Sequence, residues 1–195
     1  MTSTIKPEWA AIKNIKNNKP LFFVHVPKCG GTYVNSIISK VDVKSFKKID
    51  EFTHKTATKE VNDNHIVFAV IREPISRYES LINYRISTNR IANLFNSTID
   101  DHDDINSYVN NQPDEILSSF SPYYTLTYYS RNVDIFITID ELSDFLAFFG
   151  YDISKINYPK LNTSSRKYGR FNKKTIDRVS KIFKDDIKFY QENTS

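Results

Sequence analysis

The sequence predicts an α/β fold in which a parallel β-sheet, flanked by helices, forms a three-layer structure. Short apolar runs rich in branched and aromatic residues, typical of buried strands, alternate along the chain with segments of helical spacing. A length of 195 residues with 39% hydrophobic residues suits one domain with its own core and excludes global disorder. We expect a polar lead-in over residues 1–20, with Trp9 packed back on the body, and a single domain over residues 21–195.

Each predicted element follows from its local pattern. Nearly continuous apolar runs predict strands at residues 21–26, 43–49, 65–71 and 134–139. Helical spacing predicts helices at residues 32–40, 75–87 and 141–149, the second opened by Pro74 and the third ended by Gly150. A last helix is predicted at residues 173–191, because five apolar side chains share one face: Ile176, Val179, Phe183, Ile187 and Tyr190.

The composition excludes several classes of function. A single cysteine rules out an internal disulfide framework and a cysteine-based zinc site. The DDHDD stretch at residues 100–104 lacks the glycine and the terminal glutamate of a calcium loop, so we expect a solvated acidic loop and no metal site. The net charge of +4 suits an anionic ligand but is too weak to indicate nucleic acid. Without a membrane-spanning apolar segment or a signal-peptide core, a cytoplasmic protein with no stable membrane anchor is expected.

The stretch VPKCGGTYV at residues 26–34 joins a predicted strand to a predicted helix. Adjacent glycines let backbone N–H groups approach an anion at a helix N-terminus, while Lys28 adds a full charge and Thr32 a hydroxyl. The spacing does not fit the nucleotide-kinase loop G-x-x-x-x-G-K-[ST], and no aspartate-ended strand obviously holds magnesium. From the loop alone, a metal-free phosphate-binding loop and a plain glycine turn both stay open.

A second polar cluster, IREPISRYES, follows the strand predicted at residues 65–71. Arg72 comes just past the end of that strand, at the sheet edge where parallel α/β proteins bind ligands, and its guanidinium could clamp a phosphate. Ser80, two helical turns further on, could add a hydroxyl. An ion pair is the alternative role of Arg72, and Arg77 is expected to pair with Glu73 at helical spacing.

Together these two stretches resemble the sulfotransferases. VPKCGGTY resembles their 5′-phosphosulfate loop, in the form H-[IV]-P-K-[TC]-G-G-T. IREPISRYES resembles their 3′-phosphate motif, in which an arginine, here Arg72, is followed eight residues later by a serine, here Ser80. VDIFITIDELSDFL and KLNTSSRKYGRF also resemble later parts of the branch that contains the carbohydrate (heparan sulfate 2-O type) sulfotransferases and their bacterial relatives. The resemblance covers nearly the whole chain.

The resemblance implies a fold related to the P-loop kinases and a donor, 3′-phosphoadenosine 5′-phosphosulfate (PAPS), used without a metal. By similarity, Lys28 contacts the oxygen that bridges phosphate and sulfate, and Arg72 and Ser80 hold the 3′-phosphate. The loop around the 5′-phosphate would be formed by Cys29, Gly30, Gly31, Thr32 and Tyr33. A C-terminal segment would close over the same nucleotide through Ser165, Arg166 and Lys167.

Sulfuryl transfer to a hydroxyl requires charge stabilisation at the leaving oxygens and a general base. His54 is the predicted base, because it follows the second strand at the same sheet edge as Lys28 and resembles a histidine that related sulfotransferases place before a short helix. A surface loop histidine is the alternative, with Glu51 and Glu73 in reserve. We expect His25 to be structural and His65 to be exposed. Direct in-line transfer to the acceptor hydroxyl requires no covalent enzyme intermediate, and no histidine is obviously paired with Cys29, so no catalytic role for its thiol is expected.

The expected acceptor is a hydroxyl, with a carbohydrate favoured, and residues 88–120 are expected to select it. Four tyrosines either pack on the core or line the acceptor site: Tyr123, Tyr124, Tyr128 and Tyr129. Two other functions stay open. A P-loop-type nucleotide kinase would depend on magnesium. A non-catalytic module that binds anionic polymers or nucleic acid would have a long basic face, and SSRKYGRFNKK is the only stretch of the sequence with this composition. The oligomeric state stays open.

Overall fold

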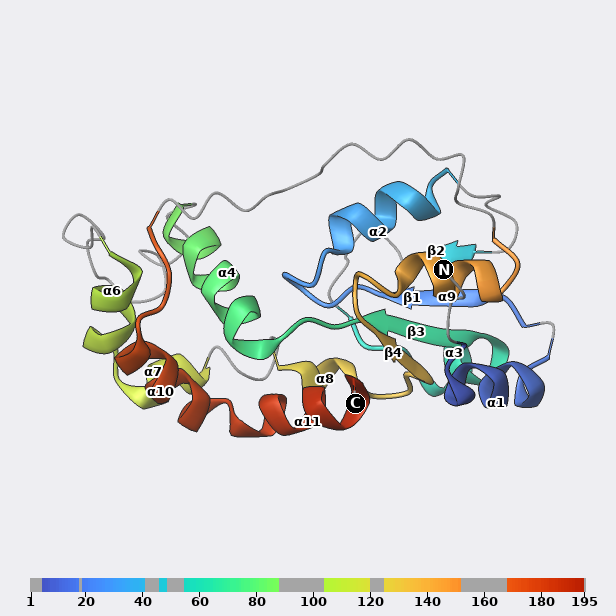
Figure 1. Cartoon of the computed structure of the whole chain (residues 1–195). Helices are drawn as coiled ribbons and strands as arrows, with labels where there is room; N and C mark the ends of the chain where they lie inside the picture. Colours follow the sequence, from blue (N-terminus) through green and yellow to red (C-terminus); the bar gives the residue numbers. More distant parts are fainter. Residues whose placement is uncertain are drawn as a thin grey trace.

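The computed structural model describes residues 5–17, 19–40, 46–48, 55–87, 104–119, 125–151 and 168–194. Its centre is a parallel sheet with the strand order β2-β1-β3-β4. The strands are β1 (Leu21–Val24), β2 (Phe46–Lys48), β3 (Ile66–Val70) and β4 (Ile135–Ile137). Each lies within a predicted strand, so the predicted α/β class with a parallel sheet flanked by helices is confirmed (Figure 1).

Helices occupy the intervals between the strands and both ends of the described chain. They are α1 (Pro7–Ile15), α2 (Gly31–Ile38), α3 (Lys59–Asn64), α4 (Pro74–Ser87), α6 (Ile105–Asn111), α7 (Asp114–Ser119), α8 (Leu126–Tyr129), α9 (Leu142–Phe148), α10 (Lys173–Ile182) and α11 (Lys184–Thr194). In the part of the chain that the structure describes, no helix is long and apolar enough to cross a membrane.

Aromatic side chains attach helices to both faces of the sheet. Phe68 of β3 contacts Phe145 of α9, with ring centroids 4.8 Å apart, and Phe145 also contacts Trp9 of α1 at 5.4 Å. Phe136 lies on the opposite face, since its neighbour Ile135 is the register partner of Phe68 and side chains alternate along a strand. The ring of Phe136 meets Phe189 of α11 at 5.0 Å.

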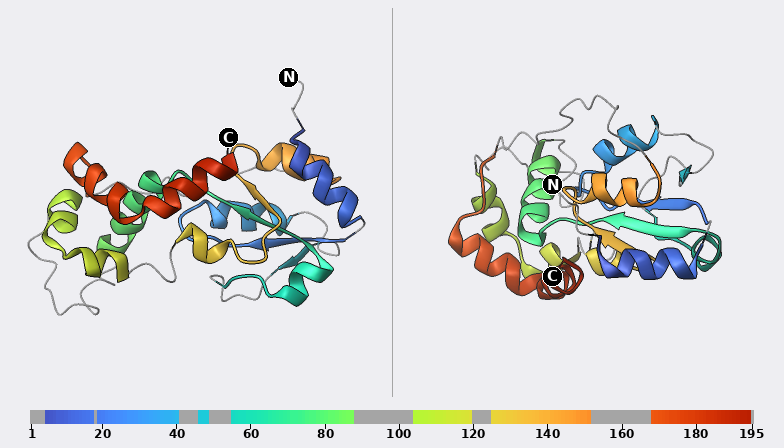
Figure 2. Two further views of the ribbon diagram at one scale, coloured as in Figure 1. Left: turned by 90° about the horizontal axis from the view of Figure 1, so that it is seen from below. Right: turned by 45° about the vertical axis from the view of Figure 1, so that its right-hand side comes forward.

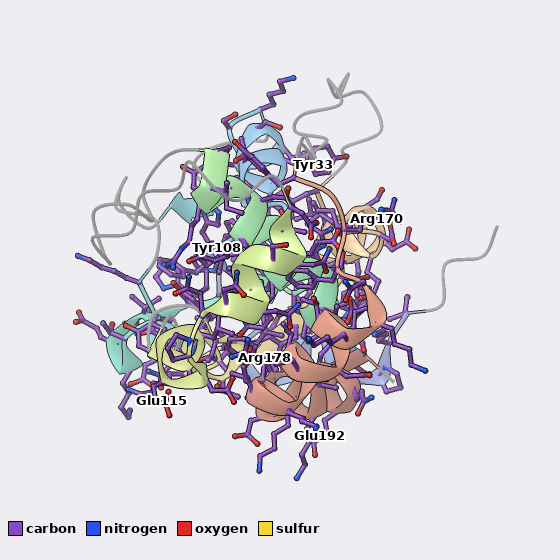
Figure 3. The ribbon with its side chains drawn as sticks, turned by 90° about the vertical axis from the view of Figure 1, so that its left-hand side faces the viewer. Tyr33, Tyr108, Glu115, Arg170, Arg178 and Glu192 are labelled. Carbon is purple, nitrogen blue, oxygen red and sulfur yellow. The ribbon has the colours of Figure 1, made fainter. Side chains whose placement is uncertain are left out.

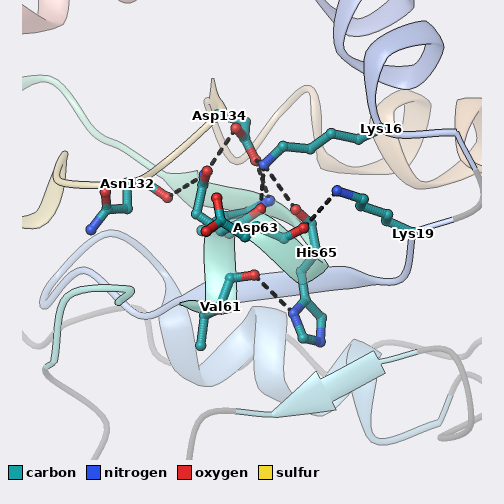
Figure 4. Close-up of polar contacts among 9 residues, drawn as sticks. Lys16, Lys19, Val61, Asp63, His65, Asn132 and Asp134 are labelled. Carbon is teal, nitrogen blue, oxygen red and sulfur yellow. Dashed lines mark hydrogen bonds and ion pairs between the residues drawn. The ribbon is translucent and has the colours of Figure 1, made fainter. Parts of the chain in front are cut away.

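The predicted lead-in contains a helix, α1, that the sequence pattern did not indicate. The expected packing of Trp9 is confirmed, because its side chain is only 2% exposed. At the end of α1, the Lys16 ammonium donates to the carbonyl oxygens of Asn62 and His65 and to Asp134 Oδ2, the last at 2.7 Å (Figure 4). Asp134 also accepts from the Val67 N–H at 2.8 Å. This network ties α1 to the amino ends of β3 and β4.

A second apolar cluster lies beyond the carboxyl ends of β1 and β3, where α4, α6, α7 and α10 gather (Figures 1 and 2). Its fully buried members include Tyr108 and Ile105, and Tyr78 stacks on Phe183 with ring centroids 3.7 Å apart. Arg178, labelled in the end-on view of Figure 3, donates to the carbonyl oxygens of Val109 and Gln112 and so ties α10 to α6. This helical cluster supports α4, the helix that follows Arg72.

The prediction of one last helix at residues 173–191 is wrong. The chain breaks at Phe183 (φ −110°, ψ 31°) into α10 and α11. The break lets α10 pack on the helical cluster while α11 turns to pack against α8 and β4. Ile176, predicted to share one apolar face with Val179 and Phe183, is 36% exposed, and the buried positions include Thr175 and Asp186.

Candidate functional site

The loop between β1 and α2 has an unusual backbone. The Cys29 N–H donates to the Val26 carbonyl at 3.4 Å, and both Lys28 (φ +65°) and Gly30 (φ +86°) adopt the left-handed region. This region is unfavourable for a lysine, so the surrounding structure must hold it there. Gly30 then serves as the N-cap of α2, and no described side chain caps this helix N-terminus. The first turn of α2 therefore opens on the carboxyl edge of the sheet.

The two adjacent glycines are required for different reasons. A Cβ atom at Gly31 would lie 2.0 Å from the Nε2 and Cδ2 atoms of His25, so the imidazole ring occupies the space of a side chain. At Gly30 the positive φ favours glycine, and a Cβ would meet Ile139 Cδ1 at 3.1 Å. The structural role expected for His25 stays a prediction, supported by the packing of its ring on Gly31 and on Phe23; His25 lies just past β1 rather than inside it.

Arg72 lies at the same edge as this loop. Its Nη1 donates to the Lys28 carbonyl at 3.4 Å, and its Nε and Nη2 donate to Ser76 Oγ at 3.1 Å and 2.6 Å. The structure thus brings together Lys28 and Arg72, which the sequence placed after two different strands. The parallel pairing of β1 with β3 explains the proximity, because both strands end at this edge.

Lys28 and Arg72 have no negatively charged partner among the residues that the structure describes. Among the described residues, no carboxylate forms an ion pair with Lys28 or Arg72. Burial lowers the pKa of the Lys28 ammonium below its ordinary value, and the charge of Arg72 lowers this pKa further. Two positive groups that repel each other, beside a helix N-terminus that no described side chain caps, form an arrangement that an anion would neutralise.

Helix α4 lines this site with one stripe of side chains. Ser76 accepts the hydrogen bonds of Arg72, and the ring of Tyr84 lies 4.4 Å from the Lys28 ammonium. Ser80 stands four residues from each of them, on the same face of the helix, and is 6% exposed. The structure therefore places Ser80 between two side chains that contact Arg72 and Lys28.

Glu73 has a different role from the expected pairing with Arg77. Its carboxylate accepts from the backbone N–H groups of Ile75 and Ser76 at 2.9 Å and 2.7 Å, so it caps the N-terminus of α4. Arg77 instead points inward, with no exposed side-chain surface, and donates from Nε to the Pro27 carbonyl at 3.0 Å. The expected ion pair between Arg77 and Glu73 is wrong, because the partner of Arg77 is Asp186.

The Cys29 thiol lies behind the loop and is 3% exposed. Burial raises its pKa, although the charges of Arg77 and Arg72 oppose this shift. A raised pKa keeps the sulfur protonated and poorly nucleophilic at neutral pH. A catalytic thiol therefore has no support in this geometry, in line with the expectation for direct transfer.

Asp186 is a buried acid that sequence reasoning missed. It accepts from the Tyr78 hydroxyl at 2.8 Å and from the Leu126 N–H at 2.9 Å, and its Oδ2 lies 3.6 Å from Arg77 Nη1. In the sequence it stands in KDDIKFYQ, where an acidic residue is typical of a solvated helix face. No local signal distinguishes it from Asp185, which is exposed.

Two further expectations concern side chains near the sheet. His65 was expected to be exposed, which is wrong: it is 7% exposed, its Nδ1 bonds to the Val61 carbonyl at 2.9 Å, and its ring contacts Phe22. Tyr129 is 1% exposed and belongs to the core, and Tyr128 packs against the same core.

Several predicted residues lie outside the part of the chain that the structure describes, namely Glu51, His54, His102, Tyr123, Tyr124, Ser165, Arg166 and Lys167. The described part of the candidate site therefore consists of the loop, Arg72 and one face of α4. Comparisons of the chain with protein-family models, with curated proteins and with solved structures found no match.

Proposed function

We propose that this chain is a sulfotransferase that moves a sulfuryl group from PAPS to an acceptor hydroxyl, with a carbohydrate as the favoured acceptor. The observation that carries the proposal is that Arg72 contacts the loop at the Lys28 carbonyl, so that two positive side chains, neutralised by no described carboxylate, lie beside the N-terminus of α2, which no described side chain caps. Such a site suits a ligand with several negative charges. The resemblance of the two motifs to sulfotransferases gives the ligand its identity.

In the proposed complex, each part of the site neutralises a different charge of the nucleotide. The 5′-phosphate lies against the first turn of α2, within the loop formed by Cys29, Gly30, Gly31, Thr32 and Tyr33. Arg72 and Ser80 hold the 3′-phosphate. The C-terminal segment adds Ser165, Arg166 and Lys167, and the fold is proposed to be related to that of P-loop kinases.

The proposed reaction is a direct in-line displacement at sulfur. The acceptor oxygen forms a bond to sulfur while the bond from sulfur to the bridging oxygen breaks, leaving 3′-phosphoadenosine 5′-phosphate. Lys28 stabilises the negative charge that develops on that oxygen. His54 takes the acceptor proton. Because β2 is parallel to β1, the chain leaves β2 at the edge where Lys28 lies, which supports this role for His54.

Calorimetry with 3′-phosphoadenosine 5′-phosphate, with and without magnesium, tests the proposal. Tight binding without metal is expected. Binding of nucleoside triphosphates only with magnesium would instead indicate a kinase, and binding of anionic polymers alone would indicate a non-catalytic module. Arg72→Ala should abolish nucleotide binding, whereas Arg131→Ala, which removes an exposed arginine near the amino end of β4, should leave it unchanged.

The base is tested separately. His54→Ala should retain nucleotide binding and lose sulfuryl transfer to a panel of carbohydrate hydroxyl acceptors. Loss of nucleotide binding in this variant would show that His54 supports the nucleotide site rather than the proton transfer.

A further inference from the structure

Arg77 is the most deeply buried cation in the described chain, and its contacts lie directly behind the loop between β1 and α2. Its side chain has no exposed surface, and its Nε donates to the Pro27 carbonyl at 3.0 Å. Pro27 immediately precedes Lys28, whose backbone is in the left-handed region. The guanidinium therefore contacts the backbone at the point where the loop turns toward the sheet edge.

The other side of the guanidinium faces Asp186 of α11. Its Nη1 lies 3.6 Å from Asp186 Oδ2, and the carboxylate is itself 2% exposed. The N–H groups of Leu126 and Thr127, at the start of α8, and the Tyr78 hydroxyl all donate to the same carboxylate. The Asp186 carboxylate of α11 thus joins the guanidinium and the Tyr78 hydroxyl of α4 to the start of α8.

Only part of the hydrogen-bonding capacity of Arg77 is used. Among the described residues, its Nη1 and Nη2 atoms have no hydrogen-bond partner, although Nη1 forms the longer ion pair with Asp186. A buried guanidinium with unused donors is costly unless its charge and its position serve another purpose. The well-formed hydrogen bond is the one to Pro27, in the loop itself.

We propose that Arg77 is a positioning residue, which holds the backbone of the loop that carries Lys28, and that Asp186 holds Arg77 in turn. The catalytic consequence of this inference rests on the proposed function. There, Arg77 and Asp186 fix the Lys28 ammonium relative to the oxygen that bridges phosphate and sulfate, without contacting the nucleotide. A purely structural ion pair is the competing explanation, and it predicts only a loss of global stability.

The single cysteine of the chain provides a direct measurement. The Cys29 thiol is buried behind the loop, so alkylation by iodoacetamide requires the loop to open. Arg77→Lys keeps the positive charge but removes the Nε donor to Pro27, and should raise the alkylation rate about tenfold. Asp186→Asn should raise it by a smaller factor. Combining both changes should open the loop no further than Arg77→Lys alone.

Arg178→Lys is the matched control. Arg178 also ties helices together through backbone carbonyls, but it does so in the helical cluster and away from the loop. This variant should leave the alkylation rate within about twofold of the wild-type rate, even if it lowers the Tm as much as Arg77→Lys does. Equal alkylation in the two arginine variants at equal Tm, or no change in either, would overturn the proposal. If Arg77→Lys does not fold, Asp186→Asn carries the same comparison.

Affinity for 3′-phosphoadenosine 5′-phosphate separates this inference from the proposed function. If the wild type binds the nucleotide, Arg77→Lys should weaken binding about tenfold and Arg178→Lys should not. If the wild type does not bind it, the proposed function fails, while the alkylation rates still decide whether Arg77 holds the loop.

Discussion

The Lys28 ammonium lies 4.4 Å from the centre of the Tyr84 ring, so an aromatic side chain of α4 supports the loop cation. A contact of this kind at a partly exposed site contributes about 0.5–1 kcal/mol. A double-mutant cycle with Tyr84→Leu and Lys28→Met should give a coupling free energy of that size in urea unfolding. Tyr84→Phe, which keeps the ring, should retain the coupling. A coupling near zero would show that the ring does not hold the cation.

The pH dependence of stability should show that the charge of Lys28 destabilises the fold. Its pKa in the folded protein lies below its ordinary value of 10.5, since burial and Arg72 disfavour the charged form. The destabilisation is complete below the folded pKa and disappears as pH rises through that pKa toward 10.5. Lys28→Met should therefore be more stable than the wild type near neutral pH.

The difference in stability between Lys28→Met and the wild type should narrow as the pH rises into the alkaline range. Urea unfolding of both proteins at several pH values measures the difference, because groups other than Lys28 titrate alike in the two. A difference that stays constant across the alkaline range would contradict the assignment.

Gly31→Ala should destabilise the protein by about 1–3 kcal/mol, because the new Cβ would lie 2.0 Å from the His25 ring. Without that ring, alanine should favour α2 by up to about 1 kcal/mol over glycine. In the His25→Ala background the same substitution should therefore be neutral or stabilising, as measured by chemical denaturation. Destabilisation of equal size in both backgrounds would place the obstruction elsewhere.

Lys16→Met should cost about 3 kcal/mol, because it leaves the Asp134 carboxylate without its cation in a partly buried network (Figure 4). Lys16 and Asp134 are each only 11% exposed at the side chain. Lys59→Met is the matched control, since the pair of Lys59 with Asp63 is exposed and screened by solvent and should contribute almost nothing to stability. Similar losses for the two variants in thermal unfolding would show that burial does not strengthen the Lys16 pair.

The sheet and the loop could be predicted because their signals are local. Continuous apolar runs such as LFFV and IVFAV indicate buried strands, and parallel strands necessarily bring their carboxyl ends to one edge. Because Lys28 and Arg72 each follow such a strand, this rule predicts that the two residues lie at the same edge of the sheet. The glycine pair indicated a close approach, although the approaching group, the His25 ring, could not be inferred from spacing.

The parts that could not be predicted depend on contacts between distant segments. Arg77 and Glu73 have the spacing of a surface ion pair, and only the position of α11 reveals that Arg77 points inward to Asp186. The break at Phe183 has no proline or glycine to mark it, and it arises because α10 and α11 pack on different clusters. His65 is buried because α3 provides a carbonyl for its ring nitrogen.

Support of the loop by Asp186 also constrains the order of events during synthesis on the ribosome. The loop is translated early, yet the carboxylate that fixes Arg77 behind it belongs to α11, which is translated much later. A nascent or prematurely terminated chain that stops before α11 would carry both strands and both glycines but leave a buried guanidinium without its counter-charge. Nonsense mutations that stop the chain before Asp186 should therefore remove a loop competent to bind, in addition to removing α11.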